Sequence, residues 1–321
     1  MAVTVGRFAF TIGVTRDGEP VHRAPVSVAA CLEDAVFRAV VSGQISNDGN
    51  IPSHLITPVW SGEDPPAVAA LELRLGDLPV TRYDTDVVAP QARALIKGLI
   101  KDGTLTSDGA VDWQLDAHEA PAAKIEPHRF SARVSRAPLP LESVQLPSAA
   151  PGEFSVEFDH RLLTELSDAV ASADAVERAW LLLGSICHDR SRGAAELRVR
   201  GAVPVETGRG GASQHHFAFD PATFVAARRA AVSTMAGAIP IGWSHSHPPC
   251  AECRATNGCL VDTRFFSTDD VEVHSTAFTS PYTVGLVIGK VGNRPAAQLG
   301  FRLYGWQKAQ IRERDYRVSE I

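Results

Sequence analysis

The sequence is poor in lysine and has no cluster of basic residues. Only five of its 321 residues are lysine, so arginine carries most of the positive charge. The formal net charge is −6. Surfaces that bind nucleic acid are normally strongly basic. The composition therefore argues against a nucleic-acid partner.

Long apolar segments without interruption are also missing. The longest uncharged segment, 230–251, contains Pro240 and two histidines, which is not the pattern of a membrane-spanning helix. The apolar stretch 8–14 follows a single arginine and lacks a small-residue cleavage site, so it does not indicate a secretory signal. Hydrophobic and charged contents of 45% and 21% are typical of a folded protein. We expect a cytoplasmic protein with no membrane partner.

Cysteines are few and unevenly placed. Three of the five, Cys250, Cys253 and Cys259, fall within ten residues. In a protein with no export signal, such clustering favours metal binding over a disulfide framework. A disulfide between one pair, or three reduced thiols, are the alternatives. We expect Cys31 to be a small buried core residue rather than a nucleophile, because free cysteine is among the most buried residue types.

A proline-rich segment divides the chain. Residues 119–152 contain six prolines and few large apolar side chains, which is typical of an extended connector. We expect an N-terminal α+β domain over 1–118, of no family that we recognise, and a second domain over 153–321. Both mix helices with strands, so the predicted fold class is mixed α/β.

Hydrophobic periodicity and turn residues predict the elements of each domain. In the first domain we expect a hairpin (6–14 and 20–28), helices at 31–43 and 91–103, and strands at 70–75 and 80–88. In the second we expect helices at 160–172 and 220–237 and from Ser267, and strands at 178–186, 195–206, 215–220, 238–247, 282–291 and 296–306. The segment 178–186 is apolar nearly throughout, as in a strand covered on both faces.

Two histidines stand at the end of the predicted strand 238–247. His245 and His247 occupy positions i and i+2, so their side chains point to the same side of the strand. Two imidazoles make half of a tetrahedral zinc shell, and Asp270 can supply a third ligand, leaving the fourth position for water as in catalytic zinc sites. Taken alone, a His-x-His pair is more often structural. Ser267 and Asp270 also have the spacing of an ordinary helix N-terminus.

A third feature lies upstream of these two. Glu177 precedes the apolar strand, followed in order by His245-x-His247 and Ser267-x-x-Asp270. This combination resembles the JAB/MPN family of zinc metalloproteases, also called JAMM proteases, over about half of the chain. The resemblance implies that the two histidines and Asp270 hold a catalytic zinc. It implies that Glu177 acts as general base and then general acid, and that Ser267 donates to the oxyanion.

The resemblance also implies a fold and an activity. The second domain would have an MPN/cytidine-deaminase-like sheet flanked by helices. The activity would be that of a zinc-dependent isopeptidase, cleaving the amide bond after the C-terminal glycine of a ubiquitin-like protein, in deconjugation or precursor processing. Its partners would be that protein, its conjugates and enzymes of the conjugation pathway, and the Ala- and Arg-rich composition favours a bacterial source. The alternatives are a hydrolase that releases an amino acid from a small sulfur-carrier protein, and a non-catalytic MPN scaffold.

The sequence departs from the family pattern in one place. The segment between His247 and Ser267 is longer than the usual motif, and the insertion carries the three clustered cysteines. A Cys-x-x-Cys pair with a third cysteine is a plausible nucleus for a second, structural zinc. Its fourth ligand is open among these candidates: Cys187, His188, His215, His216 and Asp262.

Overall fold

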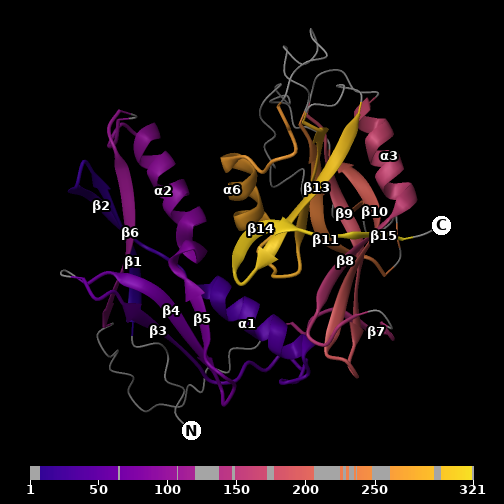
Figure 1. Cartoon of the computed structure of the whole chain (residues 1–321), viewed down its shortest axis with the longest axis horizontal. Helices are drawn as coiled ribbons and strands as arrows, with labels where there is room; N and C mark the ends of the chain where they lie inside the picture. Colours follow the sequence, from indigo (N-terminus) through magenta and orange to yellow (C-terminus); the bar gives the residue numbers. More distant parts are fainter. Residues whose placement is uncertain are drawn as a thin grey trace. The chain divides into compact units, whose positions relative to one another are not determined.

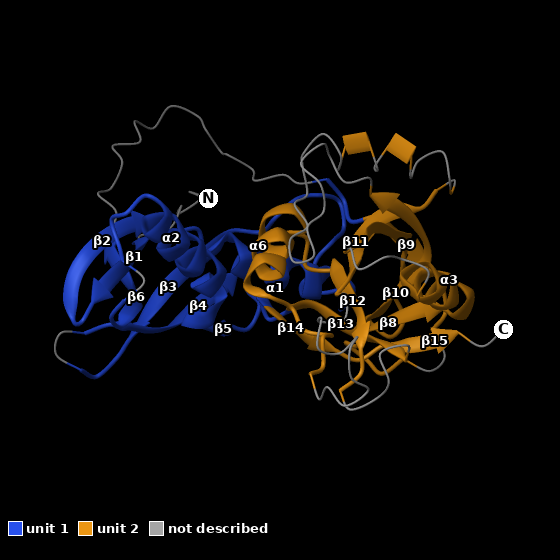
Figure 2. Cartoon of the chain, turned by 90° about the horizontal axis from the view of Figure 1, so that it is seen from above, with its two compact units in different colours: residues 1–139, 307–310 blue, residues 140–306, 311–321 orange. Residues whose placement is uncertain are grey.

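The chain divides into two compact units. The computed structural model describes residues 8–63, 66–106, 108–119, 137–146, 149–171, 177–205, 225–226, 229–230, 235, 237–247, 261–292 and 298–319. One unit comprises 1–139 with 307–310, and the other comprises 140–306 with 311–321 (Figure 2). Of the predicted connector, 120–136 lies outside the described residues. Leu141–Ser143 forms a short strand, β7, so this part of the connector belongs to a sheet.

The described part of the first unit contains two small antiparallel sheets and two α-helices. One sheet has the order β2-β1-β6 and the other the order β3-β4-β5. The elements are β1 (Phe8–Arg16), β2 (Glu19–Pro25), α1 (Ala29–Val41), β3 (His54–Trp60), β4 (Val68–Leu75), β5 (Thr81–Asp84), the 3-10 helix η1 (Thr85–Val88), α2 (Ala89–Lys101) and β6 (Val111–Glu119). The predicted hairpin and both predicted helices are confirmed.

One strand predicted in this unit needs correction, and two observed strands, β3 and β6, were not predicted. The strand predicted over 80–88 ends at Asp84, and the chain continues as η1. Pro90 lies in the first turn of α2, where its fixed φ suits a helix and its missing N–H leaves no intrahelical bond unmade. Strand β3 was not predicted, because Pro58 stands in its middle. β3 is an edge strand, where a missing N–H is tolerated.

Side chains of α2 pack on the sheet β2-β1-β6. Ala92 and Leu99 of α2 are buried against Ile12 and Val14 of β1. Ala92 and Leu99 are seven residues apart and share one face of the helix, and Ile12 and Val14 are two residues apart and share one face of the strand. Each element therefore buries one face. Cys31 of α1 is fully buried, as predicted, and burial raises the pKa of its thiol to about 12. The complete burial of Cys31 confirms its place in the core, and a thiol with a raised pKa is poorly suited to act as a nucleophile.

Nine strands of the described chain form one curled mixed sheet in the second unit (Figure 1). The order is β14-β13-β12-β11-β9-β10-β8-β15, and β7 pairs with the far end of β9. β11–β12, β10–β8 and β15–β8 are parallel pairs, and β9 is antiparallel to both β10 and β11. The elements are β8 (Phe154–Asp159), α3 (His160–Ala171), β9 (Ala179–Asp189), β10 (Ala194–Val205), β11 (Ile239–Ser246), α6 (Thr268–Ala277), β12 (Val284–Lys290), β13 (Leu299–Gln307), β14 (Gln310–Arg314) and β15 (Arg317–Ser319).

Helices cover the central strands of this sheet from both sides. α3 and α6 lie on opposite faces in both views (Figures 1 and 2). Nearly every residue of β9 is buried, which confirms the prediction of a strand covered on both faces. The core on the α6 side is formed by Ala179, Leu181, Leu183, Val203, Val205, Trp243 and Phe278. The mixed α/β architecture predicted from the sequence is therefore confirmed.

Some predicted elements cannot be compared with the structure. The strand at 215–220 lies outside the described residues, and so does most of the helix at 220–237. None of the helices in the described ranges is long and apolar enough to cross a membrane.

Candidate metal centre

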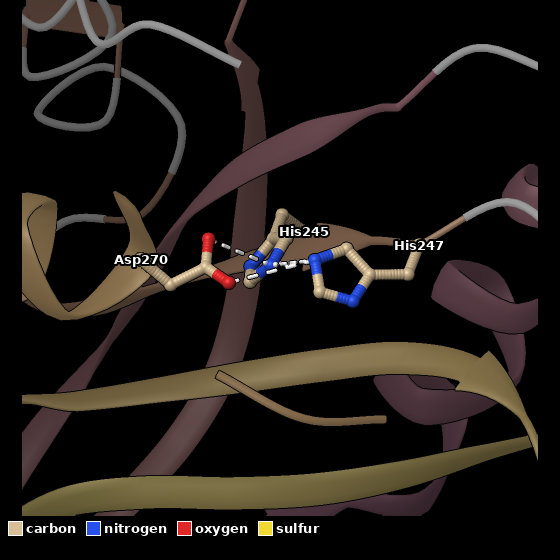
Figure 3. A group of neighbouring side chains, drawn as sticks. All are labelled: His245, His247 and Asp270. Atoms are coloured by element: carbon tan, nitrogen blue, oxygen red, sulfur yellow. Dashed lines mark hydrogen bonds and ion pairs between the residues drawn. The ribbon is translucent and has the colours of Figure 1, made fainter. Parts of the chain in front are cut away.

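Strand β11 carries the two histidines. His245 lies within the strand, opposite Ala179 of β9 and Val287 of β12. His247 follows the last strand residue, and its backbone N–H donates to the carbonyl of Ile288 at 2.9 Å. The alternation of the strand brings both imidazoles to one side, as predicted (Figure 3). His245 is only 1% exposed, so its ring is almost entirely removed from water.

Helix α6 carries the acidic side chain. Ser267 is its N-cap: the Ser267 Oγ accepts from the backbone N–H of Asp270 at 3.2 Å. In return, Oδ2 of Asp270 accepts from the backbone N–H of Ser267 at 2.7 Å. This reciprocal capping box fixes both side chains relative to the helix start, which the sequence predicted at Ser267. Asp270 is 8% exposed, and its carboxylate faces the histidines (Figure 3).

The three side chains converge at their ligand atoms. The Nε2 atoms of His245 and His247 are 3.0 Å apart. Oδ1 of Asp270 lies 3.1 Å from Nε2 of His245, and Oδ2 lies 3.5 Å from Nε2 of His247. One ligand atom from each residue lies within 4.8 Å of the other two. Two imidazole nitrogens and one carboxylate oxygen form a donor set that suits zinc and several other divalent metals, so this group can hold a metal ion.

The carbonyl of Thr263 determines which ring nitrogen of His247 is directed at His245 and Asp270. Nδ1 of His247 lies 2.7 Å from the carbonyl oxygen of Thr263. A carbonyl can only accept, so Nδ1 carries a proton and donates it. The lone pair of a neutral His247 is then on Nε2, directed at His245 and Asp270. Histidines that bind metals usually have this second hydrogen bond, and the donor chemistry therefore fits a metal ligand.

Thr263 is itself held on strand β12. Its N–H donates to the carbonyl of Lys290 at 3.1 Å, and its Oγ1 accepts from the N–H of Lys290 at 2.8 Å. Gly289 leaves the space for this contact, since a Cβ there would lie 2.5 Å from Oγ1 of Thr263. No sequence pattern indicates Thr263, because its carbonyl and not its side chain contacts His247.

Burial and mutual charge shift the pKa values of the three residues in different directions. Burial lowers the pKa of His245, and Asp270 opposes this without reversing it. Burial also acts on His247, but Asp270, the Thr263 carbonyl and the charge of Glu177 outweigh it and raise the pKa. Burial disfavours the ionised form of Asp270, yet the two histidines and the Ser267 N–H hold its pKa well below the usual range. The carboxylate is thus ionised, and a proton on the pair of imidazoles resides on His247.

Glu177 lies directly before β9 and close to this group. It is 8% exposed, and its charge is one of those that raise the pKa of His247. Its neighbour Arg178 is tied to the residue between the histidines. The backbone N–H of Arg178 donates to Oγ of Ser246 at 3.0 Å, and the N–H of Ser246 donates to the Arg178 carbonyl at 2.9 Å. This backbone pairing brings the glutamate next to the two histidines.

The second predicted metal site lies mostly outside the described residues. This applies to Cys250, Cys253 and Cys259 and to two of the candidate fourth ligands, His215 and His216. Among the other candidates, Cys187 and His188 are buried within β9. Asp262 is paired with Arg264 at 2.7 Å and Arg302 at 3.3 Å, and the hydrogen bonds from Arg264 lower its pKa to about 2. The Asp262 carboxylate is thus already paired with two guanidinium groups, which a metal ion would have to replace.

Comparisons with known proteins give a weak structural likeness and no sequence match. No protein-family model matches the sequence, and no curated protein sequence matches it. Among solved structures, the solution structure of protein DSY2949 from Desulfitobacterium hafniense is similar, with 19% sequence identity and a TM-score of 0.36. The match covers 52% of this chain and 94% of that one.

Proposed function

We propose that the second unit is a zinc-dependent hydrolase of amide bonds, of the JAB/MPN type. The observation that carries the proposal is the convergence of His245, His247 and Asp270, with Glu177 beside them and Ser267 fixed at the same helix start. The order of these residues along the chain is that of the JAMM motif. An MPN/cytidine-deaminase-like fold for this unit is part of the same proposal.

The metal would be held by His245, His247 and Asp270. When bound, zinc supplies a Lewis acid that polarises a carbonyl and lowers the pKa of a coordinated water toward about 7. The Thr263 carbonyl accepts a hydrogen bond from Nδ1 of His247, so in the neutral imidazole the lone pair for the metal is on Nε2. Burial keeps His245 neutral by lowering its pKa. The ionised Asp270 adds the negative charge that a divalent cation requires.

Glu177 would move the proton. Its carboxylate is nearly buried and lies in the field of the same group. In amide hydrolysis it accepts a proton from the attacking water and later delivers it to the leaving amine. A positioned acid–base group of this kind contributes about 10²- to 10⁴-fold to the rate.

Ser267 would stabilise the charge that develops on the carbonyl oxygen. The capping box uses its Oγ only as an acceptor, from the N–H of Asp270. The hydroxyl proton can therefore be donated to an oxyanion without loss of the cap. Removal of one such donor typically costs about 10²- to 10³-fold in kcat.

The substrate class in this proposal is a ubiquitin-like protein that is attached to a target or carries a precursor extension. Cleavage after its C-terminal glycine releases it from the target or the extension. Enzymes of the conjugation pathway are then partners, in the cytoplasm. All five residues of the motif are present, which favours an enzyme over a non-catalytic scaffold.

Metal content per chain tests the proposal. The wild type, purified without chelators, should contain zinc that the double variant His245→Ala/His247→Ala lacks. The matched control, His22→Ala/His118→Ala, removes two exposed histidines and should keep the metal. Zinc that persists in the first variant would assign it to the cysteine-rich segment, and absence of zinc from the wild type would overturn the proposal.

Cleavage then tests the chemistry. The substrate is a ubiquitin-like protein with an extension after its terminal glycine, and the readout is release of the extension. Glu177→Gln keeps the size of the side chain and removes the base, so it should retain zinc and lose cleavage. Equal cleavage by this variant and the wild type would contradict the assigned role.

A further inference from the structure

The two histidines of the candidate metal centre are held in different ways. Nδ1 of His247 donates to the Thr263 carbonyl. Nδ1 of His245 is buried and has no hydrogen-bond partner among the described residues. A metal-binding imidazole normally depends on a bond to its second nitrogen for its orientation. Another contact must therefore fix the ring of His245.

Trp243 makes that contact. It lies two residues before His245 on β11, so both side chains are on the same face of the sheet. The two rings stack, with centroids 4.5 Å apart and planes inclined by 13°. Trp243 is 1% exposed and is confined on its other sides by Phe266 at 5.7 Å and Phe278 at 5.9 Å. A rigid, buried indole thus forms one wall of the space in which the His245 ring can turn.

His274 in turn fixes Trp243. The indole N–H of Trp243 donates to Nδ1 of His274 at 3.1 Å, and His274 is fully buried. His274 lies on α6, four residues after Asp270, so the same helix face carries a ligand and this acceptor. β11 and α6 are therefore joined by two parallel contacts, His245 with Asp270 and Trp243 with His274.

We infer that Trp243 and His274 are positioning residues for the metal: His274 orients the indole, and the indole orients the ligand ring of His245. This inference rests on the proposed metal centre but assigns these two residues a role that the motif does not contain. It predicts that loss of the acceptor on His274 will weaken metal binding even though His274 is not one of the ligand group.

Paired substitutions at position 274 separate positioning from folding. His274→Asn keeps an acceptor near the place of Nδ1, whereas His274→Phe keeps a ring and removes the acceptor. The matched control is Trp306→Phe. It removes another buried indole hydrogen bond of the same aromatic cluster, from Trp306 Nε1 to the Phe278 carbonyl at 2.7 Å, without touching Trp243. Thermal unfolding of each variant reports its stability.

Two readouts follow. Zinc Kd is measured by competition with a chelating dye, and the visible spectrum of the cobalt-loaded protein reports ligand geometry. We expect His274→Phe to weaken zinc binding about 10- to 100-fold and to change the cobalt spectrum, as for other residues that orient metal ligands. His274→Asn and Trp306→Phe should stay close to the wild type in both.

Each outcome bears on the inference. Wild-type affinity and spectrum in His274→Phe would overturn it and leave the proposed metal centre intact. Equal weakening in Trp306→Phe would also overturn it. This variant keeps a ring against His274 and leaves the bond from Trp243 to His274 in place, so loss of stability alone would then explain the effect. A wild type that binds neither zinc nor cobalt would overturn the proposed function together with this inference.

Discussion

The Nε2 atoms of His245 and His247 face each other at 3.0 Å, and both lie beside the carboxylate of Asp270. Ionisable groups this close do not titrate independently. The pKa of His247 is raised and that of His245 is lowered, so the first proton that the pair binds in the metal-free protein goes to His247. A metal must displace this proton, because imidazole binds metals in its neutral form.

We therefore expect zinc affinity to fall as the pH falls. Below the raised pKa of His247, each pH unit should weaken the apparent Kd about tenfold, the effect of displacing one proton. Asp270 does not add to the pH dependence of zinc affinity near neutral pH, since its pKa is well below the usual range and it is already ionised. Competition titrations at several pH values, corrected for protonation of the chelator, measure the slope. A Kd that is independent of pH would contradict the assignment.

Ser267 should affect stability and catalysis separately. Ser267→Ala removes the cap acceptor and should lower the free energy of unfolding by about 1 kcal/mol. It also removes the oxyanion donor, so kcat should fall about 10²- to 10³-fold while zinc is retained. Ser267→Thr keeps the hydroxyl and should preserve most of the stability and most of kcat. Steady-state kinetics with metal analysis and denaturant unfolding give the two quantities.

The N-cap of helix α3, Asp159, provides the control for Ser267. Oδ1 of Asp159 accepts from the N–H of Arg161 at 2.8 Å, at the start of α3. Asp159→Ala should cost a comparable amount of stability and leave kcat unchanged. If it lowered kcat as much as Ser267→Ala does, the catalytic role of Ser267 would be reduced to that of a cap.

Gly289 should be required for zinc affinity without contacting the ligands. The added Cβ of Gly289→Ala would lie 2.5 Å from Oγ1 and 3.1 Å from backbone atoms of Thr263, so the Thr263 segment must move. We expect a loss of stability of about 1–3 kcal/mol from overpacking. Zinc binding should weaken about 10- to 100-fold because the carbonyl partner of His247 is displaced. Unfolding and zinc competition are the measurements.

Gly201→Ala on β10 is the matched control for Gly289→Ala. Its added Cβ would meet the terminal methyl of Met235 at 2.9 Å, which is the flexible end of a side chain and can move. We expect nearly unchanged stability and zinc affinity. Normal zinc affinity in Gly289→Ala would show that the Thr263 carbonyl does not control His247.

The ligand group could be predicted because its spacings are local. His245 and His247 share a side through the two-residue period of a strand, and Ser267 and Asp270 meet through one turn of helix. Glu177 is different, because it reaches the group only through the pairing of β9 with β11. No local pattern encodes that pairing, and only the resemblance to a family indicated this residue.

The other residues of the site, Thr263 and His274, could not be predicted from the spacing of side chains in the sequence. Thr263 acts through its carbonyl, and His274 acts through an indole thirty-one positions away in the chain. Two of the strands that were not predicted have a similar cause. β7 and β15 are three residues long and are defined by their neighbours in the sheet, β9 and β8, rather than by their own periodicity.

His274 should make stability depend on pH in its own right. Burial lowers its pKa from 6.5 to about 3, with only the Thr283 backbone opposing. Between these values the unfolded chain binds a proton at this residue and the folded chain does not. The free energy of unfolding therefore rises with pH in this range, with a contribution that approaches about 1.4 kcal/mol per pH unit. Above pH 6.5 the contribution is complete, and it is lost progressively as the pH falls.

His274→Asn isolates this contribution, because asparagine does not titrate. We expect the stability of the variant to vary less steeply with pH than that of the wild type between about pH 6 and 4, and the two curves to run parallel above pH 7. Denaturant unfolding of metal-free protein at each pH gives both curves. The absence of metal removes the contribution of metal binding to stability, and the ligand histidines are present in both proteins. Parallel curves over the whole range would mean that His274 binds its proton as readily in the folded protein as in the unfolded chain, in contradiction to its complete burial.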